Sequence, residues 1–222
     1  MFFVELRYDQ KMKSDFLFLI VASPSGAGKT TLIHLLLERR NDLGFSVSHT
    51  TRKPRPGERD GVHYHFIEAQ AFEQMIERGA FIEWAWVHGH MYGTSHSEIA
   101  RAKEQGKRGI VFDVDVQGAR RIKALYPEAI AVFILPPSWE ELKRRLLNRG
   151  TESPQSLEIR LERSREEILH YAFFDYVIVN DKVEQAARAL SSIVLAEEHR
   201  TKRLALMAEG LIESMKIERN GK

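Results

Sequence analysis

The sequence predicts an α/β fold with a parallel core sheet, and three observations carry that prediction. Continuous apolar runs, typical of strands buried on both faces of a sheet, lie at 16–22, 109–115, 129–135 and 176–179. Segments with helical spacing of apolar residues separate these runs, as strand–helix–strand units require. Two stretches, about 46–96 and 138–172, interrupt the alternation, and we expect both to be insertions over one end of the sheet.

Length and composition fit this fold and exclude other classes of protein. A chain of 222 residues with 43% apolar and 29% charged residues is too apolar to be disordered throughout. The absence of cysteine excludes a disulfide scaffold, a thiolate metal site and a cysteine nucleophile. The net charge of +2 argues against nonspecific nucleic-acid binding. No apolar run approaches the roughly 20 residues of a spanning helix, so we expect a cytoplasmic protein without a membrane partner.

The chain opens with a strand, a glycine loop and a helix. Residues 1–14 show no clear period, and we expect an N-terminal extension up to residue 15. The apolar strand at 16–22 leads into a loop rich in glycine and serine, and a helix follows at 30–39.

The first interrupting stretch predicts short strands and one helix. Alternating residues indicate strands at 45–48 and 63–67, with a polar loop between them. Apolar residues at helical spacing predict a helix at 69–78, and an aromatic strand follows at 81–87. We expect residues 89–93 to form a turn.

The second half of the chain returns to alternating helices and strands. The expected helices are 97–105, 117–126, 139–148, 156–171 and 183–203. Ser138 is the expected N-cap of the third of these, because Glu140 and Glu141 follow it in the first turn. The tail, 204–222, is charged and mildly helical, and its composition indicates no role.

The glycine loop after the first strand is close to the P-loop pattern G-x-x-x-x-G-K-[ST], with serine at the first position. It comprises Ser23, Pro24, Ser25, Gly26, Ala27, Gly28, Lys29 and Thr30. In such a loop, backbone N–H groups point at phosphate oxygens, Lys29 reaches the β- and γ-phosphates, and the Thr30 hydroxyl binds Mg²⁺. The alternative is a turn with chance glycines. The motif predicts a bound nucleoside triphosphate and leaves its use open.

The first interrupting stretch carries groups suited to a second phosphate. Arg52 and Arg55 flank a proline in a polar loop that begins near Ser48, and guanidinium groups bind phosphate bidentately. Tyr64 adds a phenol on the following strand. The alternative is a solvated charged loop.

A single carboxylate, Glu83, interrupts the aromatic strand at 81–87. A carboxylate among aromatic residues is costly unless it is paired, and it could accept from a ring N–H and an exocyclic amine, as guanine offers. Tyr92 and Thr94 bring a phenol and a hydroxyl nearby. The alternative is that Glu83 lies on the solvent face of an edge strand.

Acidic and basic groups follow later strands. Asp113 and Asp115 end a buried strand, where ligands bind in open α/β sheets, although an acid there can instead cap the next helix. A basic stretch from 143 to 165 predicts a lid that closes on phosphates, or else a pair of salt-bridged surface helices. Its basic residues are Lys143, Arg144, Arg145, Arg149, Arg160, Arg163 and Arg165.

Taken together, these residues resemble guanylate kinase. The resemblance begins with the glycine loop and continues through Ser48-x-Thr-Thr-Arg52-x-Pro-Arg55-x-Gly-Glu58 and Tyr64-x-Phe. It runs on through Phe81-Ile-Glu83, Tyr92-Gly-Thr94, Asp113-Val-Asp115-x-Gln-Gly, Arg149-Gly-Thr-Glu and Val177-Ile-Val-Asn180-Asp. The matches cover about residues 16–195, so they are more specific than the glycine loop alone.

The resemblance implies a P-loop fold of three layers that phosphorylates GMP or dGMP to GDP, with ATP as donor and Mg²⁺ as cofactor. It divides the chain into a core (16–45, 97–137, 173–203), a GMP-binding insertion (46–96), a helical lid (138–172), and the two end segments 1–15 and 204–222. By position, Ser48, Arg52, Arg55, Tyr64 and Tyr92 would hold the GMP phosphate, and Glu83, Thr94, Asp113 and Asp115 would lie at the GMP site. Lys29, Arg52, Arg145, Arg149 and Arg160 would be catalytic. Asn180 would lie near adenine.

Transfer in line between two bound nucleotides needs positioning and charge neutralisation rather than a covalent intermediate. Three other functions compete: a P-loop kinase for another substrate, a catalytically inactive domain that binds proteins, and a nucleic-acid binder that uses the arginine clusters. The complete set of P-loop and arginine residues disfavours the second, and the near-neutral charge disfavours the third. A homo-oligomer is compatible with the sequence.

Overall fold

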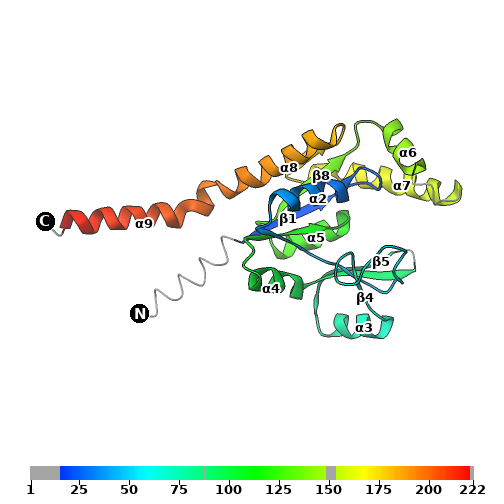
Figure 1. The fold of residues 1–222 in the computed structure, drawn as a ribbon, viewed down its shortest axis with the longest axis horizontal. Coiled ribbons are helices and arrows are strands. Elements are labelled where there is room, and N and C mark those ends of the chain that lie inside the picture. The colour runs from blue at the N-terminus through cyan, green and yellow to red at the C-terminus, as the bar shows by residue number, and fades with distance from the viewer. Residues whose placement is uncertain (1–15, 88, 149–153, 221–222) are drawn as a thin grey trace.

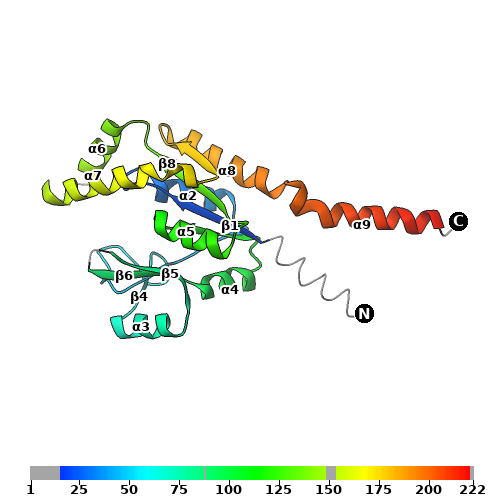
Figure 2. The same cartoon turned by 180° about the vertical axis from the view of Figure 1, so that it is seen from behind.

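The computed structural model describes residues 16–87, 89–148 and 154–220, and the predicted extension 1–15 lies outside them. Two sheets organise the described part of the chain, a parallel core sheet of five strands and a mixed sheet of four. Figures 1 and 2 show that the mixed sheet and the helices α6 and α7 lie at the same end of the core sheet.

The core sheet has the strand order β2-β7-β1-β8-β9, with β1 at its centre. Its members are β1 (Leu17–Ala22), β2 (Leu43–Phe45), β7 (Gly109–Asp113), β8 (Ile130–Leu135) and β9 (Tyr176–Val179). All of the neighbours pair in parallel, and Val21 lies opposite both Asp113 of β7 and Val132 of β8. The predicted parallel sheet is confirmed.

Alternation along β1 explains the three layers. Leu19 and Val21 face a core cluster shared with α2 (Lys29–Arg39) and α8 (Val183–Glu198). Ile20 and Ala22 face a second cluster shared with α4 (His96–Glu104) and α5 (Val116–Leu125). All four β1 side chains are fully buried. Burial of a valine, leucine or isoleucine side chain contributes about 1.5–3 kcal/mol, so both helical layers are held by the same strand.

The mixed sheet has the order β4-β3-β6-β5 and belongs to the first interrupting stretch. Its strands are β3 (His49–Thr50), β4 (His65–Phe66), β5 (Phe81–Val87) and β6 (His90–Ser95). The helix α3 (Ala69–Glu77) covers it through Phe72, whose ring stacks on Phe81 with centroids 4.4 Å apart.

Two predictions in this stretch are wrong. The strand expected at 45–48 is instead β2, which ends at Phe45 and pairs with β7 in the core sheet. The turn expected at 89–93 is largely the strand β6, which pairs antiparallel with β5. Both errors concern short segments, whose conformation is determined by the strand that they pair with rather than by local preference.

Helices α6 (Trp139–Leu147) and α7 (Pro154–Leu169) form the second interrupting stretch, and a short 3₁₀ helix, η1 (Tyr171–Phe173), follows them. The predicted cap of α6 is confirmed, because the Glu141 backbone N–H donates to Ser138 Oγ at 3.1 Å. The helix predicted at 183–203 is wrong at its end. It divides into α8 and α9 (Thr201–Asn220), and α9 extends away from the core sheet (Figures 1 and 2).

In the part of the chain that the structure describes, no helix combines the length and the apolar character needed to cross a lipid bilayer.

A substitution at Gly109 tests how closely the central strands β1 and β7 pack. A Cβ at this position would lie 2.6 Å from the Leu17 carbonyl oxygen and 2.8 Å from Leu17 Cβ. We expect Gly109→Ala to lower the free energy of unfolding by about 1–3 kcal/mol, because overpacking forces the backbones apart. Urea unfolding would measure the change. The control is Gly210→Ala on α9, where an added Cβ would meet no atom within 4 Å apart from the backbone of its own helix. We expect this substitution to be neutral or slightly stabilising.

Candidate active site

The glycine loop connects the carboxyl end of β1 to α2. Gly26 and Gly28 adopt φ of 88° and 92°, in the left-handed region that favours glycine. A Cβ on Gly28 would also lie 2.4 Å from Asn180 Nδ2. Both glycines are therefore required by the loop's shape, which supports the P-loop interpretation over chance glycines.

Lys29 begins α2 and points back across the end of the core sheet. Its ammonium group lies 2.6 Å from Asp113 Oδ1 and donates to the Val114 carbonyl oxygen at 2.8 Å. Both side chains are largely buried, with 18% and 24% of their surface exposed. The parallel pairing of β1 with β7 makes this contact, because it places both strand ends at one edge.

Asn180, which follows β9, and Arg145 of α6 also contact the glycine loop. Asn180 is 1% exposed, and its Nδ2 donates to the Ala27 carbonyl oxygen at 2.8 Å. Arg145 of α6 donates to the Asn180 carbonyl oxygen at 3.0 Å, and its Nε donates to Glu141 Oε1 at 2.7 Å. Asn180 therefore supports the loop, and its contact with adenine stays a prediction.

A cleft of about 240 Å³ lies between the two sheets. The core contributes Lys29, Asp113, Val114 and Asp115. The mixed sheet and the segment before it contribute Ser48, Tyr64, Glu83, Ala85, Val87, Tyr92 and Gly93. The structure thus brings the P-loop lysine together with most of the residues that the resemblance assigned to GMP.

Glu83 faces this cleft. On β5, the residues Glu83, Ala85 and Val87 line the cleft, whereas Trp84 and Trp86 are exposed. The Thr94 hydroxyl donates to Glu83 Oε1 at 2.6 Å. Burial raises the pKa of the Glu83 carboxyl, and the Thr94 hydrogen bond opposes that rise only in part. The alternative of a solvent-facing glutamate is therefore wrong.

Arg52 is held at the rim of the cleft by a partner that the sequence analysis did not assign. Its guanidinium binds both carboxylate oxygens of Glu58 at 2.9 Å, and its Nε lies 3.2 Å from the Tyr92 hydroxyl. The guanidinium also lies 5.5 Å from the centre of the Tyr64 ring. Glu58 in addition accepts the Arg55 backbone N–H at 2.7 Å, so it holds the loop at both arginines.

The comparison with known proteins agrees with this geometry. The guanylate kinase family model matches residues 17–197. The chain belongs to the guanylate kinase family. Enzymes of this family phosphorylate GMP to GDP with ATP as phosphoryl donor and Mg²⁺ as the usual cofactor, so this chain is a nucleoside monophosphate kinase of purine metabolism.

Relatives cover most of the chain. A guanylate kinase from Dechloromonas aromatica (strain RCB) is 51% identical over 177 residues, which are 80% of this chain and 87% of the relative. One from Myxococcus xanthus (strain DK1622) is 47% identical over 88% of this chain and 93% of its own length. The crystal structure of guanylate kinase from Anaplasma phagocytophilum has a TM-score of 0.70 at 33% identity and covers 87% of this chain and 92% of its own.

Within this guanylate kinase fold, Asp115 caps a helix, which is the alternative role that the sequence allowed for it. It is the N-cap of α5, and its Oδ1 accepts the Gly118 backbone N–H at 2.7 Å. Asp115 still lines the cleft, so capping does not remove it from the site.

The remaining predicted arginines lie in three settings. Arg55 is exposed on the loop after β3, and Arg160 is partly buried on α7. Arg149 falls outside the described residues. The structure adds Glu167 of α7, which lies near Lys29 and the Ser25 backbone N–H. Burial raises the pKa of its carboxyl to about 7, against the lowering effect of Lys29. The sequence did not indicate Glu167, because it lies on a helix with several exposed glutamates.

The start of α2 suits a magnesium ion beside bound phosphates. Thr30 is exposed in the first turn, next to Lys29 and the glycine loop. Mg²⁺ takes oxygen ligands and retains several waters, so the Thr30 hydroxyl fits as the protein's contribution, with the phosphates supplying further oxygens.

Asn180 gives a test of the loop's support. We expect Asn180→Ala to raise the KM for ATP by about ten-fold, because a lost buried hydrogen bond of about 1–3 kcal/mol frees the loop. Steady-state kinetics with varied ATP and saturating GMP would measure it. The exposed Asn41 provides a control, since Asn41→Ala should leave both KM values unchanged. An unchanged KM for ATP in Asn180→Ala would contradict the support role.

Proposed function

We propose that this chain carries out in-line transfer of the γ-phosphoryl group of ATP to GMP, and to dGMP, in the cleft between the two sheets. The observation that carries the proposal is the convergence of Lys29 with Glu83, Tyr64 and Tyr92 on one cleft. A donor loop and an acceptor pocket that open into the same space suit direct transfer, which needs proximity and no covalent intermediate.

On the donor side, the loop from Ser23 to Thr30 holds the phosphates of ATP through its backbone N–H groups and Lys29. In the structure the Lys29 ammonium group pairs with Asp113 at 2.6 Å. A γ-phosphate bound at the loop would bring a second anion to the same ammonium group. Mg²⁺ bound at Thr30 supplies charge neutralisation on the phosphate oxygens. Asn180 keeps the loop in shape and lies toward the adenine.

On the acceptor side, one group of residues binds the GMP phosphate and another recognises guanine. Ser48, Arg52, Arg55, Tyr64 and Tyr92 hold the GMP phosphate. Glu58 keeps the Arg52 guanidinium in place, and its own carboxyl has a lowered pKa because of that pairing. Glu83 and Thr94 recognise the guanine edge, with Asp113 and Asp115 at the floor of the site. A carboxylate accepts the guanine ring N–H and amine, whereas adenine offers no such ring N–H.

The helices α6 and α7 serve as a lid, and Arg145, Arg149 and Arg160 act on the transferring phosphoryl group. Arg145 supports this role, because it donates to the Ala27 carbonyl oxygen of the glycine loop at 3.5 Å and to the Asn180 carbonyl oxygen at 3.0 Å. Closure of basic helices over the cleft stabilises developing charge and excludes water that would otherwise hydrolyse ATP.

We also propose the division into a core, a GMP-binding insertion at 46–96 and a lid at 138–172. The near balance of 33 basic and 31 acidic residues supports work on small nucleotides rather than on nucleic acid or a membrane. The cytoplasm, where GMP and ATP are present, is the proposed location.

A coupled ADP-release assay with GMP, dGMP, AMP, CMP and UMP tests the function. We expect GMP and dGMP to be phosphorylated, with activity dependent on Mg²⁺. Lys29→Ala should lower turnover by at least a hundred-fold without unfolding the chain, because the charge that stabilises the transferring phosphoryl group is lost. Circular dichroism and thermal melting check the fold. A preference for another monophosphate, or near-normal turnover in Lys29→Ala, would contradict the proposal.

Glu83→Gln tests recognition of guanine. Loss of hydrogen bonds to a charged acceptor, about 1.5–3 kcal/mol, should lower kcat/KM for GMP by ten-fold or more and leave any turnover of AMP unchanged. The matched control is Thr94→Ser, which keeps the hydroxyl that binds Glu83.

The same variant has a predicted pH signature. Because burial raises the pKa of Glu83, the carboxylate becomes protonated, and GMP binding weakens, at a higher pH than for an ordinary glutamate. We expect the KM for GMP to rise on acidification at a higher pH than an ordinary glutamate would cause, and Glu83→Gln to abolish that rise. An equal pH dependence in both proteins would assign it to another group.

A further inference from the structure

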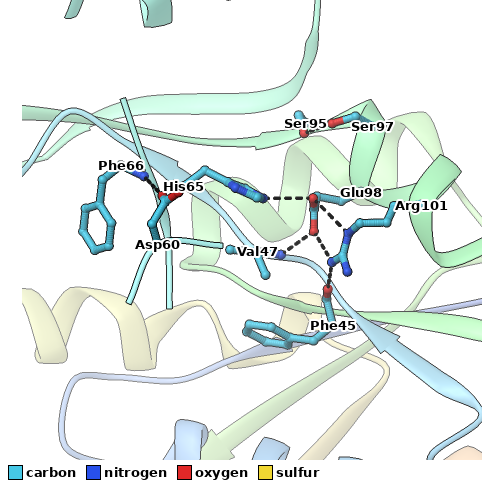
Figure 3. A network of polar contacts seen from close by, with 9 residues as sticks. All are labelled: Phe45, Val47, Asp60, His65, Phe66, Ser95, Ser97, Glu98 and Arg101. Atoms are coloured by element: carbon cyan, nitrogen blue, oxygen red, sulfur yellow. Dashed lines mark hydrogen bonds and ion pairs between the residues drawn. The ribbon is translucent and has the colours of Figure 1, made fainter. Parts of the chain in front are cut away.

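A buried carboxylate that takes no part in the proposed chemistry lies where the mixed sheet joins the core. Glu98, in the first turn of α4, is 3% exposed. It accepts the Val47 backbone N–H at 2.8 Å, lies 3.1 Å from His65 Nε2, and pairs with Arg101 at 2.6 Å (Figure 3). Arg101 also donates to the Phe45 carbonyl oxygen at 2.9 Å. Glu98, Arg101, His65 and the Phe45–Val47 backbone are called the Glu98 clasp below.

The clasp spans the connections between the two sheets. Residues 46–48 lead from β2 in the core to β3 in the mixed sheet, and the chain returns where β6 ends at Ser95 and α4 begins. Glu98 binds the first connection through Val47 and belongs to the helix that starts the return. Through His65 it also holds the edge strand β4. One carboxylate therefore joins both connections and the mixed sheet.

The electrostatics keep the Glu98 carboxylate ionised. Burial alone would raise the pKa of Glu98, but hydrogen bonds from Arg101, the Val47 backbone and His65 outweigh it, and the pKa is lowered. Next to the clasp, His49 packs on His65 with ring centroids 4.5 Å apart. Burial lowers the pKa of His49 to about 4, so its ring is neutral at pH 7.

We propose that Glu98 is a positioning residue, whose clasp fixes the mixed sheet at the orientation in which the GMP-binding groups meet the P-loop. The cleft supplies the reason. Glu83 and Tyr92 belong to the mixed sheet, and Lys29 and Asp113 belong to the core. Misplacement of reacting groups by about 1 Å can reduce a rate about a hundred-fold. This inference rests on the proposed function, because it assigns the clasp to the alignment of the two nucleotides.

The kinetic test compares two buried glutamates. Glu98→Gln keeps the size of the side chain and removes its charge. The control is Glu197→Gln, since Glu197 of α8 is 5% exposed, accepts the Tyr176 hydroxyl at 2.5 Å and pairs with Arg200. We expect both variants to melt at a lower temperature. Only Glu98→Gln should lower kcat, by about ten-fold with both substrates saturating, while the Kd for ATP stays unchanged.

A distance measurement tests the orientation without any turnover. The chain contains no cysteine, so spin labels can be attached through Glu73→Cys on α3 and Ser192→Cys on α8, both exposed positions. Double electron–electron resonance then measures the distance between the two labels, and so between the mixed sheet and the core. We expect the distance distribution to broaden or shift in Glu98→Gln and to stay as in the parent protein in Glu197→Gln.

A second variant covers the case in which Glu98→Gln does not fold. His65→Phe keeps an aromatic ring against His49 and removes the hydrogen bond to Glu98. It should show the same two effects, with kcat reduced about two- to three-fold. Unchanged kcat and distances in a folded clasp variant, or equal changes in Glu197→Gln, would overturn the proposal.

The outcomes separate the two proposals. A parent protein that does not phosphorylate GMP would refute the proposed function, and the spin-label distances would still decide whether the clasp orients the sheet. A parent protein that is active, with clasp variants that lose only melting temperature, would refute the positioning role alone.

Discussion

The parallel pairing of β1 with β7 is the constraint on which the rest of the structure depends. It brings the carboxyl ends of both strands to one edge, so that the glycine loop after Ala22 lies beside Asp113. Lys29 then reaches Asp113 at 2.6 Å across that edge. Because five of the six β1 side chains are buried between two helical layers, this edge cannot shift without disturbing the core. The glycine loop is therefore anchored to a close-packed strand.

Three basic side chains of the site are each paired with a carboxylate of the chain. Lys29 pairs with Asp113, Arg52 with Glu58 and Arg145 with Glu141, at 2.6 to 2.9 Å. These pairs fix the cations before any nucleotide binds, and a fixed dipole or charge needs little reorganisation when the reaction begins. Each of these three cations is balanced by a neighbouring carboxylate, in keeping with the net charge of +2 of the whole chain.

Much of the fold followed from the apolar runs. The five helices of the second half were placed to within a few residues, except that α8 ends at Glu198 and a separate helix follows. The short strands β2 and β6 were misplaced, because a strand of few residues takes its conformation from the neighbour that it pairs with. In the site, the loop glycines and Glu83 were predicted from their neighbours in sequence. Glu58 and Glu167 were not assigned, since the sequence does not distinguish a glutamate that the fold places beside a cation from one in solvent.

The sequence by itself determined the P-loop and the alternating order of strands and helices, because glycine placement and apolar periodicity are local properties. Its many spaced matches also determined the family. The tertiary structure decided which side of β5 carries the site, turning Glu83 inward and Trp86 to solvent. It decided that Asn180 supports the glycine loop and that Glu98 joins the two sheets. Each of these contacts joins residues far apart in the chain, and only packing brings such residues together.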